Sequence, residues 1–441
     1  MVELVILCYT NPSFRLSGWD FLFEDTIDII PFFWIRGFMA PATQGLNNSD
    51  FRRQLEEELT RNILPFWITH AMDKVNGGFY GAVTNNLEIH NEVPRSAILC
   101  ARILWTSAIA YRKLGGKEYL AMSNWAYDYL RRAFLDPEYG GVYWTVDAVG
   151  KPVFDRKHHY AQAFAIYGLS EYYRATEQPE SLALAQTLFH MLEEHAYDPI
   201  YGGYLEGSSR KWEALTDMRL SDRDLNCRKS MNTMLHILEA YTNLLRVWED
   251  ATLKAQHRAL IEIFLQRIVD HSTSHFKLFF DDQWNSLLPN VSYGHDIEGS
   301  WLLLEAAEVQ RDPALVEQVG KTAIQIAAAV YQDGLEQDGS LPYEAGPHGL
   351  VDSDKSWWVQ AEAMVGFYNA YQLSGQRRFA QASQQSWNYI QDKMVDRVHG
   401  DWIKKLHRDG TTDDNSYKVG PWECPYHHNR ACFEMLDRLK P

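Results

Sequence analysis

The segment YGGVYWTV, residues 139–146, decides the fold, because versions of it return along the whole chain. Two glycines followed by aromatic and β-branched residues are typical of a tight turn that leads into a short strand. Related segments begin at four other positions: Asn76 (NGGFYGAV), Tyr201 (YGGYLEGS), Asp338 (DGSLPYE) and His399 (HGDWIKKL). A sixth copy, SHFKLFFDDQW at Ser274, keeps the aromatic half and lacks the glycine.

The spacing of these turns indicates a repeat architecture. Gly77, Gly140, Gly202, Gly339 and Gly400 lie 63, 62, 137 and 61 residues apart, and the copy without glycine divides the longest interval. Self-similarity at a fixed period means that each unit buries its apolar face against its neighbours. The chain therefore contains six repeats.

Two stretches with helical periodicity lie between successive turns. An aromatic-rich helix follows each turn, and these helices are expected at residues 96–115, 156–176, 229–248, 292–310, 354–375 and 420–440. A more charged helix follows each of the first five, and residues 50–72 supply the sixth charged helix ahead of the first turn. Such helices bury their apolar surface best as two concentric layers, with the apolar set inside.

The early helix at 50–72 completes the last pair, which favours a closed ring over an open α-solenoid scaffold. An open stack needs polar caps, whereas a ring needs none. We predict an all-α fold: an (α/α)6 barrel of six helix pairs, with short β-hairpin-like turns at its mouth. Residues 46–441 are expected to form this one catalytic domain, and residues 1–45 an N-terminal extension outside the core.

Composition narrows the range of partners. The net charge is −16 and no Lys/Arg-rich run occurs, which argues against nucleic acid and favours a small neutral molecule. No apolar stretch reaches about 18 residues, so no membrane span is expected. Five scattered cysteines argue against a disulfide framework and favour the cytoplasm. A monomer or weak dimer is expected.

The starts of the six inner helices are expected to meet at one mouth of the barrel. Polar and aromatic residues recur there: Arg102; His158, His159 and Tyr160; Asn232 and His236; His295 and Glu298; Trp357, Trp358 and Glu362; Trp422, His427 and His428. Any one alone is explained as a helix cap or a satisfied core residue. Their recurrence in six copies predicts a small-molecule site.

Metal binding is the first alternative at this mouth. Two cysteines and two histidines lie within nine residues: Cys424, His427, His428 and Cys432. Clusters of this kind hold zinc, but the spacing matches no common zinc motif, so no metal or other cofactor is expected.

The residue types favour a sugar. Pyranose C–H faces lie flat on tryptophan, and hydroxyl groups bind to arginine, asparagine, histidine and glutamate. An unperturbed imidazole titrates near pH ~6.5, so two histidines across a ligand suit proton transfer at carbon.

Six segments carry a family resemblance: YAQAFAIYGLSEYYRAT (160–176), YDPIYGGYLEG (197–207), KSMNTMLHILEAYTNLLRVW (229–248), SYGHDIEGSWLLLEAAE (292–308), KSWWVQAEAMVGFYNAYQ (355–372) and PWECPYHHNRAC (421–432). In this order they resemble cellobiose 2-epimerases, within the N-acylglucosamine 2-epimerase superfamily, from about residue 50 to the C-terminus. The resemblance implies the same (α/α)6 barrel.

The resemblance also implies roles. His295 and His427 match the two histidines that exchange the C2 proton of the sugar through a cis-enediol. His236 or Glu298 is expected to assist ring opening. The sugar-binding residues implied are Arg102, Tyr160, Asn232, His236, Glu298, Trp357, Trp358 and Trp422. Met234 and His428 depart from the family pattern, so β-1,4-disaccharides such as cellobiose or mannobiose and free mannose or glucose all stay open as substrates.

Two rival activities stay open at this stage. An aldose–ketose isomerase of the mannose isomerase type would move the proton from C2 to C1 on the same barrel. A glycoside hydrolase would use a pair of carboxylates, such as Glu298 and Glu362. A non-catalytic sugar-binding protein is a more distant alternative, and product identity separates all three.

Overall fold

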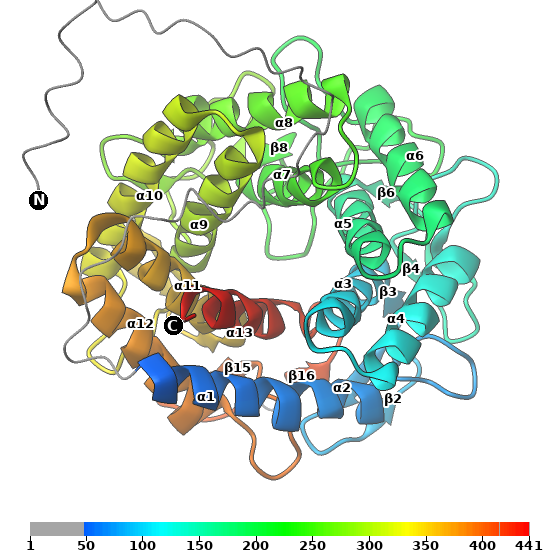
Figure 1. Ribbon diagram of the computed structural model, residues 1–441. Coiled ribbons are helices and arrows are strands. Elements are labelled where there is room, and N and C mark those ends of the chain that lie inside the picture. Colours follow the sequence, from blue (N-terminus) through cyan, green and yellow to red (C-terminus); the bar gives the residue numbers. More distant parts are fainter. Residues whose placement is uncertain (1–47, 414, 441) are drawn as a thin grey trace, which may run out of the picture. The chain divides into compact units, whose positions relative to one another are not determined.

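Two concentric rings of helices make up the barrel (Figure 1). The computed structural model describes residues 48–413 and 415–440. The inner ring consists of α3 (Ala97–Leu114), α5 (His159–Thr176), α7 (Met231–Leu245), α9 (Tyr293–Gln310), α11 (Trp357–Ser374) and α13 (Tyr426–Arg438). Each packs against the next, and α13 packs against α3. The predicted (α/α)6 barrel is confirmed.

The outer ring is amphipathic and covers the inner one. It consists of α1 (Asn48–Glu58), η1 (Leu59–Ile63) and α2 (Leu64–His70); α4 (Lys117–Tyr129) and η2 (Leu130–Phe134); α6 (Pro179–His195); α8 (Ala251–Ile263) and η3 (Phe264–Ile268); α10 (Pro313–Asp333); and α12 (Arg377–Tyr389) and η4 (Ile390–Met394). The inner helices are buried on nearly all sides, as Trp357–Tyr371 in α11 shows, because they contact neighbours and an outer helix at once.

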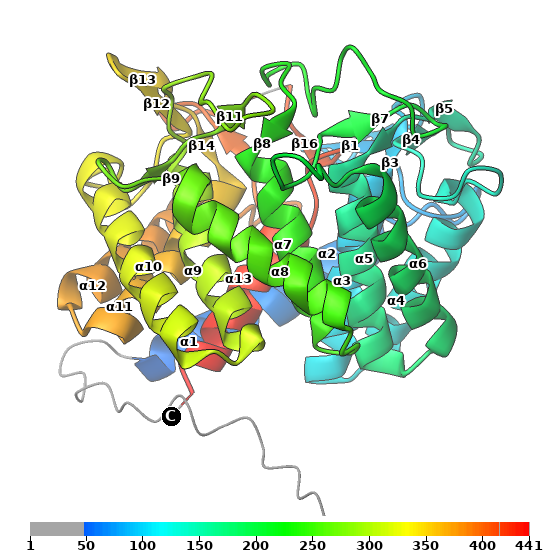
Figure 2. The same ribbon diagram turned by 90° about the horizontal axis from the view of Figure 1, so that it is seen from above.

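The short strands gather at one end of the barrel (Figure 2). They are β1 (Ala82–Thr84), β2 (Ile89–His90), β3 (Arg95–Ser96), β4 (Thr145–Val146), β5 (Pro152–Phe154), β6 (Lys157–His158), β7 (Gly207–Ser208), β8 (Lys229–Ser230), β9 (Val269–Asp270), β10 (His275–Phe276), β11 (Phe279–Phe280), β12 (Glu344–Gly346), β13 (Gly349–Asp352), β14 (Lys355–Ser356), β15 (Lys405–Leu406) and β16 (Tyr417–Val419).

One pairing rule recurs among them. The strand just before an inner helix pairs antiparallel with the strand that follows the next turn, as in β3–β4, β6–β7, β8–β11 and β14–β15. The same rule closes the ring, because β16 ahead of α13 pairs with β1 after the first turn, Val419 opposite Val83. The contact between α1 and α13 closes it a second time. An open solenoid is therefore excluded.

The largest error in the expected helix limits concerns the last inner helix. It was expected at 420–440 and runs from Tyr426 to Arg438. Pro421 and Pro425 lie in the segment that precedes it, and Pro425 occupies its N-cap. A proline fixes its own φ and disfavours the helical region for the residue before it, so the helix starts only after Pro425.

Buried ion pairs fix the turns to the inner helices. An acidic residue at the start of a turn bonds a cation two residues ahead of an inner helix in four repeats: Asp73–Arg95, Asp136–Lys157, Asp198–Lys229 and Glu336–Lys355. Asp396–Lys418 is the fifth pair and belongs to the sixth repeat, with its cation in β16. Each pair joins residues that are far apart in sequence and holds the mouth in shape.

The fourth repeat departs from this rule. Val291 stands two residues before α9, where four other repeats have a cation. Instead His275 in β10 lies 2.6 Å from Asp296 of α9 and 3.1 Å from Asp333 at the end of α10. In this repeat the ion pair is made by the second strand of the turn, β10, and not by the acidic residue at the start of the turn.

The predicted extension, residues 1–45, lies outside the described residues, and nothing in the structure tests it. In the part of the chain that is described, no helix combines the length and the apolar character that crossing a membrane requires.

Candidate active site

Arg430 of α13 lies at the centre of the inner ring. Its Nη2 donates to Glu362 Oε1 at 2.7 Å and also to Glu298, while its Nη1 donates to Glu239 and to the hydroxyl of Tyr426. The guanidinium also lies 4.8 Å from the Trp301 ring and 4.3 Å from the Tyr426 ring. Three inner helices, α7, α9 and α11, thus place their carboxylates around one cation of α13.

His427, one turn before Arg430, lies against the same carboxylates. Its Nδ1 is 2.8 Å from Glu362 Oε1 and 3.7 Å from Glu298 Oε1. A carboxylate at Nδ1 holds the proton there and leaves Nε2 as the acceptor. Burial, together with the positive charges of Arg102 and Arg430, lowers the pKa of His427 well below its usual value. The ring is therefore neutral and available as a base.

His295 occupies the first turn of α9. Its Nδ1 lies 2.8 Å from Ser292 Oγ, the hydroxyl at the N-cap of the helix. Burial, with a smaller contribution from His236, lowers the pKa of His295 to about 3. The His295 ring is 4.8 Å from the ring of Trp358, and the His427 ring is 5.4 Å from the same indole. Two neutral imidazoles therefore lie against the same indole, that of Trp358.

Glu298 is a buried carboxyl group that is only partly satisfied. Burial and the neighbouring charge of Glu362 raise its pKa to about 7. One oxygen accepts from Arg430, but Oε2 has no hydrogen-bond partner among residues 48–413 and 415–440. A buried acceptor without a partner is costly, so this oxygen is suited to a ligand hydroxyl.

Arg102 of α3, Tyr160 of α5 and His236 of α7 meet at the same place, whereas the predicted His159 bonds instead to Leu205 and Ser208 beyond the third turn. Arg102 Nη2 donates to the hydroxyl of Tyr160 at 2.8 Å, and Arg102 Nη1 lies 3.5 Å from Cys424 Sγ. The His236 ring is 4.9 Å from the Tyr160 ring, and its Nδ1 is 2.9 Å from Glu239 Oε2. The structure brings these side chains together as expected.

The remaining predicted residues lie at the edge of the cluster. Asn232 is half-buried, and its Oδ1 has no partner in the described part of the chain; the same holds for Nε1 of the buried Trp357. Trp422 lies 6.1 Å from both Tyr160 and Trp144. It helps to line a cavity of about 280 Å³ at the mouth, together with Trp144, Arg156 and the loop 217–222.

Two central residues, Glu239 and Arg430, were absent from the predicted site. Each lies three residues after a predicted histidine, Glu239 after His236 and Arg430 after His427. Positions three apart share a helix face, so Glu239 and Arg430 stand to these histidines as Glu298 stands to His295. This spacing is the sequence signal for both residues.

His428 does not belong to this cluster. Its Nε2 lies 2.8 Å from Asp401 Oδ1, and its ring is 5.0 Å from Trp402, behind the site. The structure does not bring together the donors of the alternative metal site: Cys424, His427, His428 and Cys432. Within the residues described, the one group of three metal-type donors is Glu298, Glu362 and His427.

The contacts that these three donors already make decide whether a metal ion would fit between them. Both carboxylates accept from Arg430, and His427 Nδ1 faces Glu362. A divalent ion would have to displace a guanidinium that already supplies the positive charge. The three donors therefore fit the Arg430 guanidinium better than a divalent metal ion.

Comparison with known proteins places this arrangement in a family. The family model of N-acylglucosamine 2-epimerase (GlcNAc 2-epimerase) matches residues 78–431. A cellobiose 2-epimerase of Bacteroides fragilis is 48% identical over 386 residues, which cover 87% of this chain and 98% of that protein. The chain belongs to the N-acylglucosamine 2-epimerase family.

Solved structures agree with this placement. The cellobiose 2-epimerase of Bacillus thermoamylovorans B4167 superposes with a TM-score of 0.84 at 40% identity, over 88% of this chain and all of that one. A D-mannose isomerase of Marinomonas mediterranea is a more distant relative, 22% identical over 407 residues that cover 88% of this chain and 98% of that protein. The protein is a carbohydrate epimerase, and the resemblance to cellobiose 2-epimerases is confirmed.

Proposed function

We propose that this enzyme interconverts the glucose and mannose configurations at C2 of a reducing-end aldose, with His295 and His427 as the two bases. The observation that carries the proposal is the pair of neutral imidazoles beside the Trp358 indole, next to the Arg430 cation. A neutral imidazole in a dry pocket can accept a proton from carbon, and a nearby cation stabilises the negative charge that develops.

The proposed reaction begins with ring opening. A proton leaves the C1 hydroxyl and another reaches the ring oxygen, which gives the open-chain aldehyde; His236 or Glu298 assists this exchange. One histidine then takes the C2 proton, and the electron pair moves to O1 to form a cis-enediolate. After rotation about C2–C3, the other histidine, once protonated, delivers a solvent-derived proton to the opposite face of C2.

The substrate proposed is β-1,4-linked cellobiose or mannobiose, free mannose or glucose, or both classes. The similarity to proteins named cellobiose 2-epimerase supports the disaccharides. The cavity beside Trp422 supports a second ring, because an indole offers a flat apolar face to a pyranose. Trp357, Asn232, Arg102 and Tyr160 are proposed to bind the reducing-end ring.

The fate of the C2 proton tests the two-base mechanism. Incubation with cellobiose in D₂O should place deuterium at C2 of the product, with almost no direct transfer. His295→Asn and His427→Asn should each slow epimer formation by roughly 10²–10⁴-fold, because each removes one base. Each variant should still exchange C2–H of one epimer. Retention of the substrate hydrogen at C2, or a His295→Asn enzyme near the wild-type rate, would sink the mechanism.

The rival activities give different products in the same incubation. An isomerase would yield a ketose; this alternative is kept because a distant relative is named D-mannose isomerase. A hydrolase would yield two shorter sugars. Glu298 and Glu362 both accept from one nitrogen of Arg430, which ties them to a protein cation rather than to the two sides of a glycosidic bond.

A cytoplasmic, monomeric or weakly dimeric enzyme without cofactors completes the proposal. Cys100, Cys227, Cys424 and Cys432 are free thiols buried apart from one another, which suits a reducing compartment. Sedimentation at micromolar concentration would give the oligomeric state, and prolonged chelation should leave turnover unchanged.

A further inference from the structure

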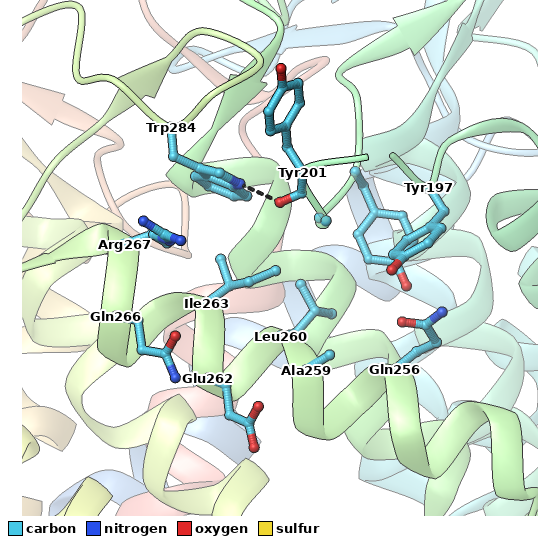
Figure 3. Close-up of a pocket in the computed structure, with 13 residues that line it drawn as sticks. Tyr197, Tyr201, Gln256, Ala259, Leu260, Glu262, Ile263, Gln266, Arg267 and Trp284 are labelled. Carbon is cyan, nitrogen blue, oxygen red and sulfur yellow. Dashed lines mark hydrogen bonds between the residues drawn. The ribbon is translucent and has the colours of Figure 1, made fainter. Parts of the chain in front are cut away.

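A second pocket opens on the outer wall of the barrel, away from the inner helices. It has a volume of about 250 Å³ and lies between the third turn, residues 197–204, and the helix α8 with η3. We call it the outer groove. Its aromatic lining is Tyr197, Tyr201, Tyr204 and Trp284, and its polar lining is Gln256, Glu262, Gln266 and Arg267. Figure 3 shows these side chains arranged around Ile263 and Leu260.

The second repeat shows what normally fills such a groove. Met191 of α6 and Ile263 of α8 each stand seven residues before the acidic residue of the next turn. A Cβ at Gly140 would lie 2.2 Å from Met191 Cε, so the methionine fills the space above the second turn. At the equivalent Gly202, the nearest atom is Ile263 Cδ1 at 3.8 Å. The shorter isoleucine leaves the third groove open.

The second repeat also covers its aromatic rings. Tyr139 lies under Arg210 and Lys211, at 5.1 Å and 5.7 Å, and His195 stacks on Trp212 at 4.7 Å. The third-repeat counterparts of Arg210 and Lys211 are Asp282 and Gln283, neither of which brings a cation. Tyr201, the counterpart of Tyr139, is 44% exposed. Lys229 lies 5.8 Å from the Tyr201 ring and Gln283 donates to its hydroxyl at 3.2 Å, yet this ring stays more exposed than Tyr139 of the second repeat.

Polar groups of the outer groove are free to bind. In the part of the chain that the structure describes, the side chains of Gln266 and Arg267 make no hydrogen bond or ion pair. Glu262 pairs with Arg258 at 3.0 Å, and the same guanidinium also pairs with Asp312 at 2.8 Å. The groove thus offers aromatic faces, amides, a guanidinium and a screened carboxylate, a combination that matches the C–H faces and hydroxyls of a neutral sugar better than it matches an anion.

We propose that the outer groove is a second carbohydrate-binding site, which holds one pyranose unit of a gluco- or manno-configured β-1,4-oligosaccharide outside the catalytic ring. The identity of the sugar rests on the proposed function. Tyr201 provides the stacking face, and Gln266 and Arg267 donate to hydroxyl oxygens. The volume lies just below the roughly 300–1,000 Å³ of drug-sized pockets, which limits the groove to about one ring.

Hydrogen exchange with cellotetraose tests the groove directly. Peptides that cover residues 197–204 and 256–267 should be protected by the sugar in the wild-type protein. Ile263→Met copies the plug of the second repeat and should abolish this protection. Met191→Ile makes the reverse exchange in the second repeat, and it should leave the protection intact. Tyr201→Ala, at an exposed position, should weaken binding by roughly 3–10-fold, as expected for one lost aromatic stack.

Peptide 292–301, around His295, reports on the catalytic site in the same experiment. Protection there without protection of the outer groove would overturn the groove alone, whereas the converse would limit the catalytic site to sugars shorter than cellotetraose and would support the groove. Groove protection that survives in Ile263→Met would overturn the proposal. Protection that depends on protein concentration rather than on sugar would assign the groove to self-association and would also overturn it.

Discussion

The turns and the centre of the barrel both bury charged side chains, but the ratio of carboxylates to cations differs between them. In the third turn one carboxylate meets one ammonium: Asp198 Oδ2 lies 2.7 Å from Lys229 Nζ, and two backbone N–H groups complete its bonding. At the centre three carboxylates, those of Glu239, Glu298 and Glu362, surround the single guanidinium of Arg430.

The difference appears in the proton affinities. Although burial opposes it, Lys229 and the backbone donors hold the pKa of Asp198 below its usual value. At the centre the carboxylates divide: Arg430 and His236 overcome burial and lower the pKa of Glu239 to about 2, whereas burial and Glu362 raise that of Glu298 to about 7. Balanced pairs maintain shape, whereas an unbalanced cluster keeps one proton exchangeable at neutral pH.

Removing the central cation should have the largest effect. Arg430→Met leaves three carboxyl groups buried together, so we expect kcat/KM to fall by at least about 10²–10³-fold, as when a main oxyanion-stabilising donor is lost. Stability should also fall by roughly 3–5 kcal/mol. Steady-state rates and urea unfolding measure both. An active Arg430→Met enzyme would show that the cluster is structural, like the turns; Arg430→Lys, which keeps the charge, is the matched control.

Breaking a balanced pair should affect stability instead. Lys229→Met leaves Asp198 without its buried partner and should cost roughly 3–5 kcal/mol of unfolding free energy, with kcat per folded molecule almost unchanged. The double variant Asp198→Asn/Lys229→Met should recover part of the loss. A large fall in kcat with little loss of stability would contradict the division between turn and centre.

The proton on Glu298 should give stability a pH dependence. Its folded pKa of about 7 lies above the ordinary 4.5, so the folded protein binds more protons between these values, and stability falls as pH rises through that window. The total is on the order of 3 kcal/mol. Glu298→Gln should lose this slope. Unfolding curves at pH 5 and pH 8 check it; equal slopes in both proteins would place the exchangeable proton elsewhere.

The fourth turn should show a smaller dependence of the same sign, at higher pH. Although burial opposes it, Asp296 and Asp333 raise the pKa of His275 to about 9. Its contribution is fully present below the unfolded pKa of about 6.5 and is lost as pH rises through about 9. After screening by solvent we expect roughly 1–2 kcal/mol. The stability difference between wild type and His275→Gln should shrink from pH 6 to pH 10; no shrinkage would mean that His275 is neutral throughout.

The sequence predicted the closed ring of helix pairs better than it predicted the partners of the buried charged residues. Six turns at an even spacing are a local signal, and closure followed from counting helices. The partner of a buried charge is not local: Arg430 and Glu239 are 191 residues apart and meet only after the ring has formed. Val291 in place of a lysine was readable from the repeat alignment, but its replacement by His275 and Asp296 required coordinates.

The position of α13 affects how the enzyme is made. This helix supplies His427 and Arg430, and it also joins α11 to α3 and α1. A chain still on the ribosome can pair its first helices in order, but the ring stays open and the centre lacks its cation until α13 emerges. The proposed two-base site is therefore completed in one step, when α13 packs into the ring, because until then His295 is present without His427 and Arg430.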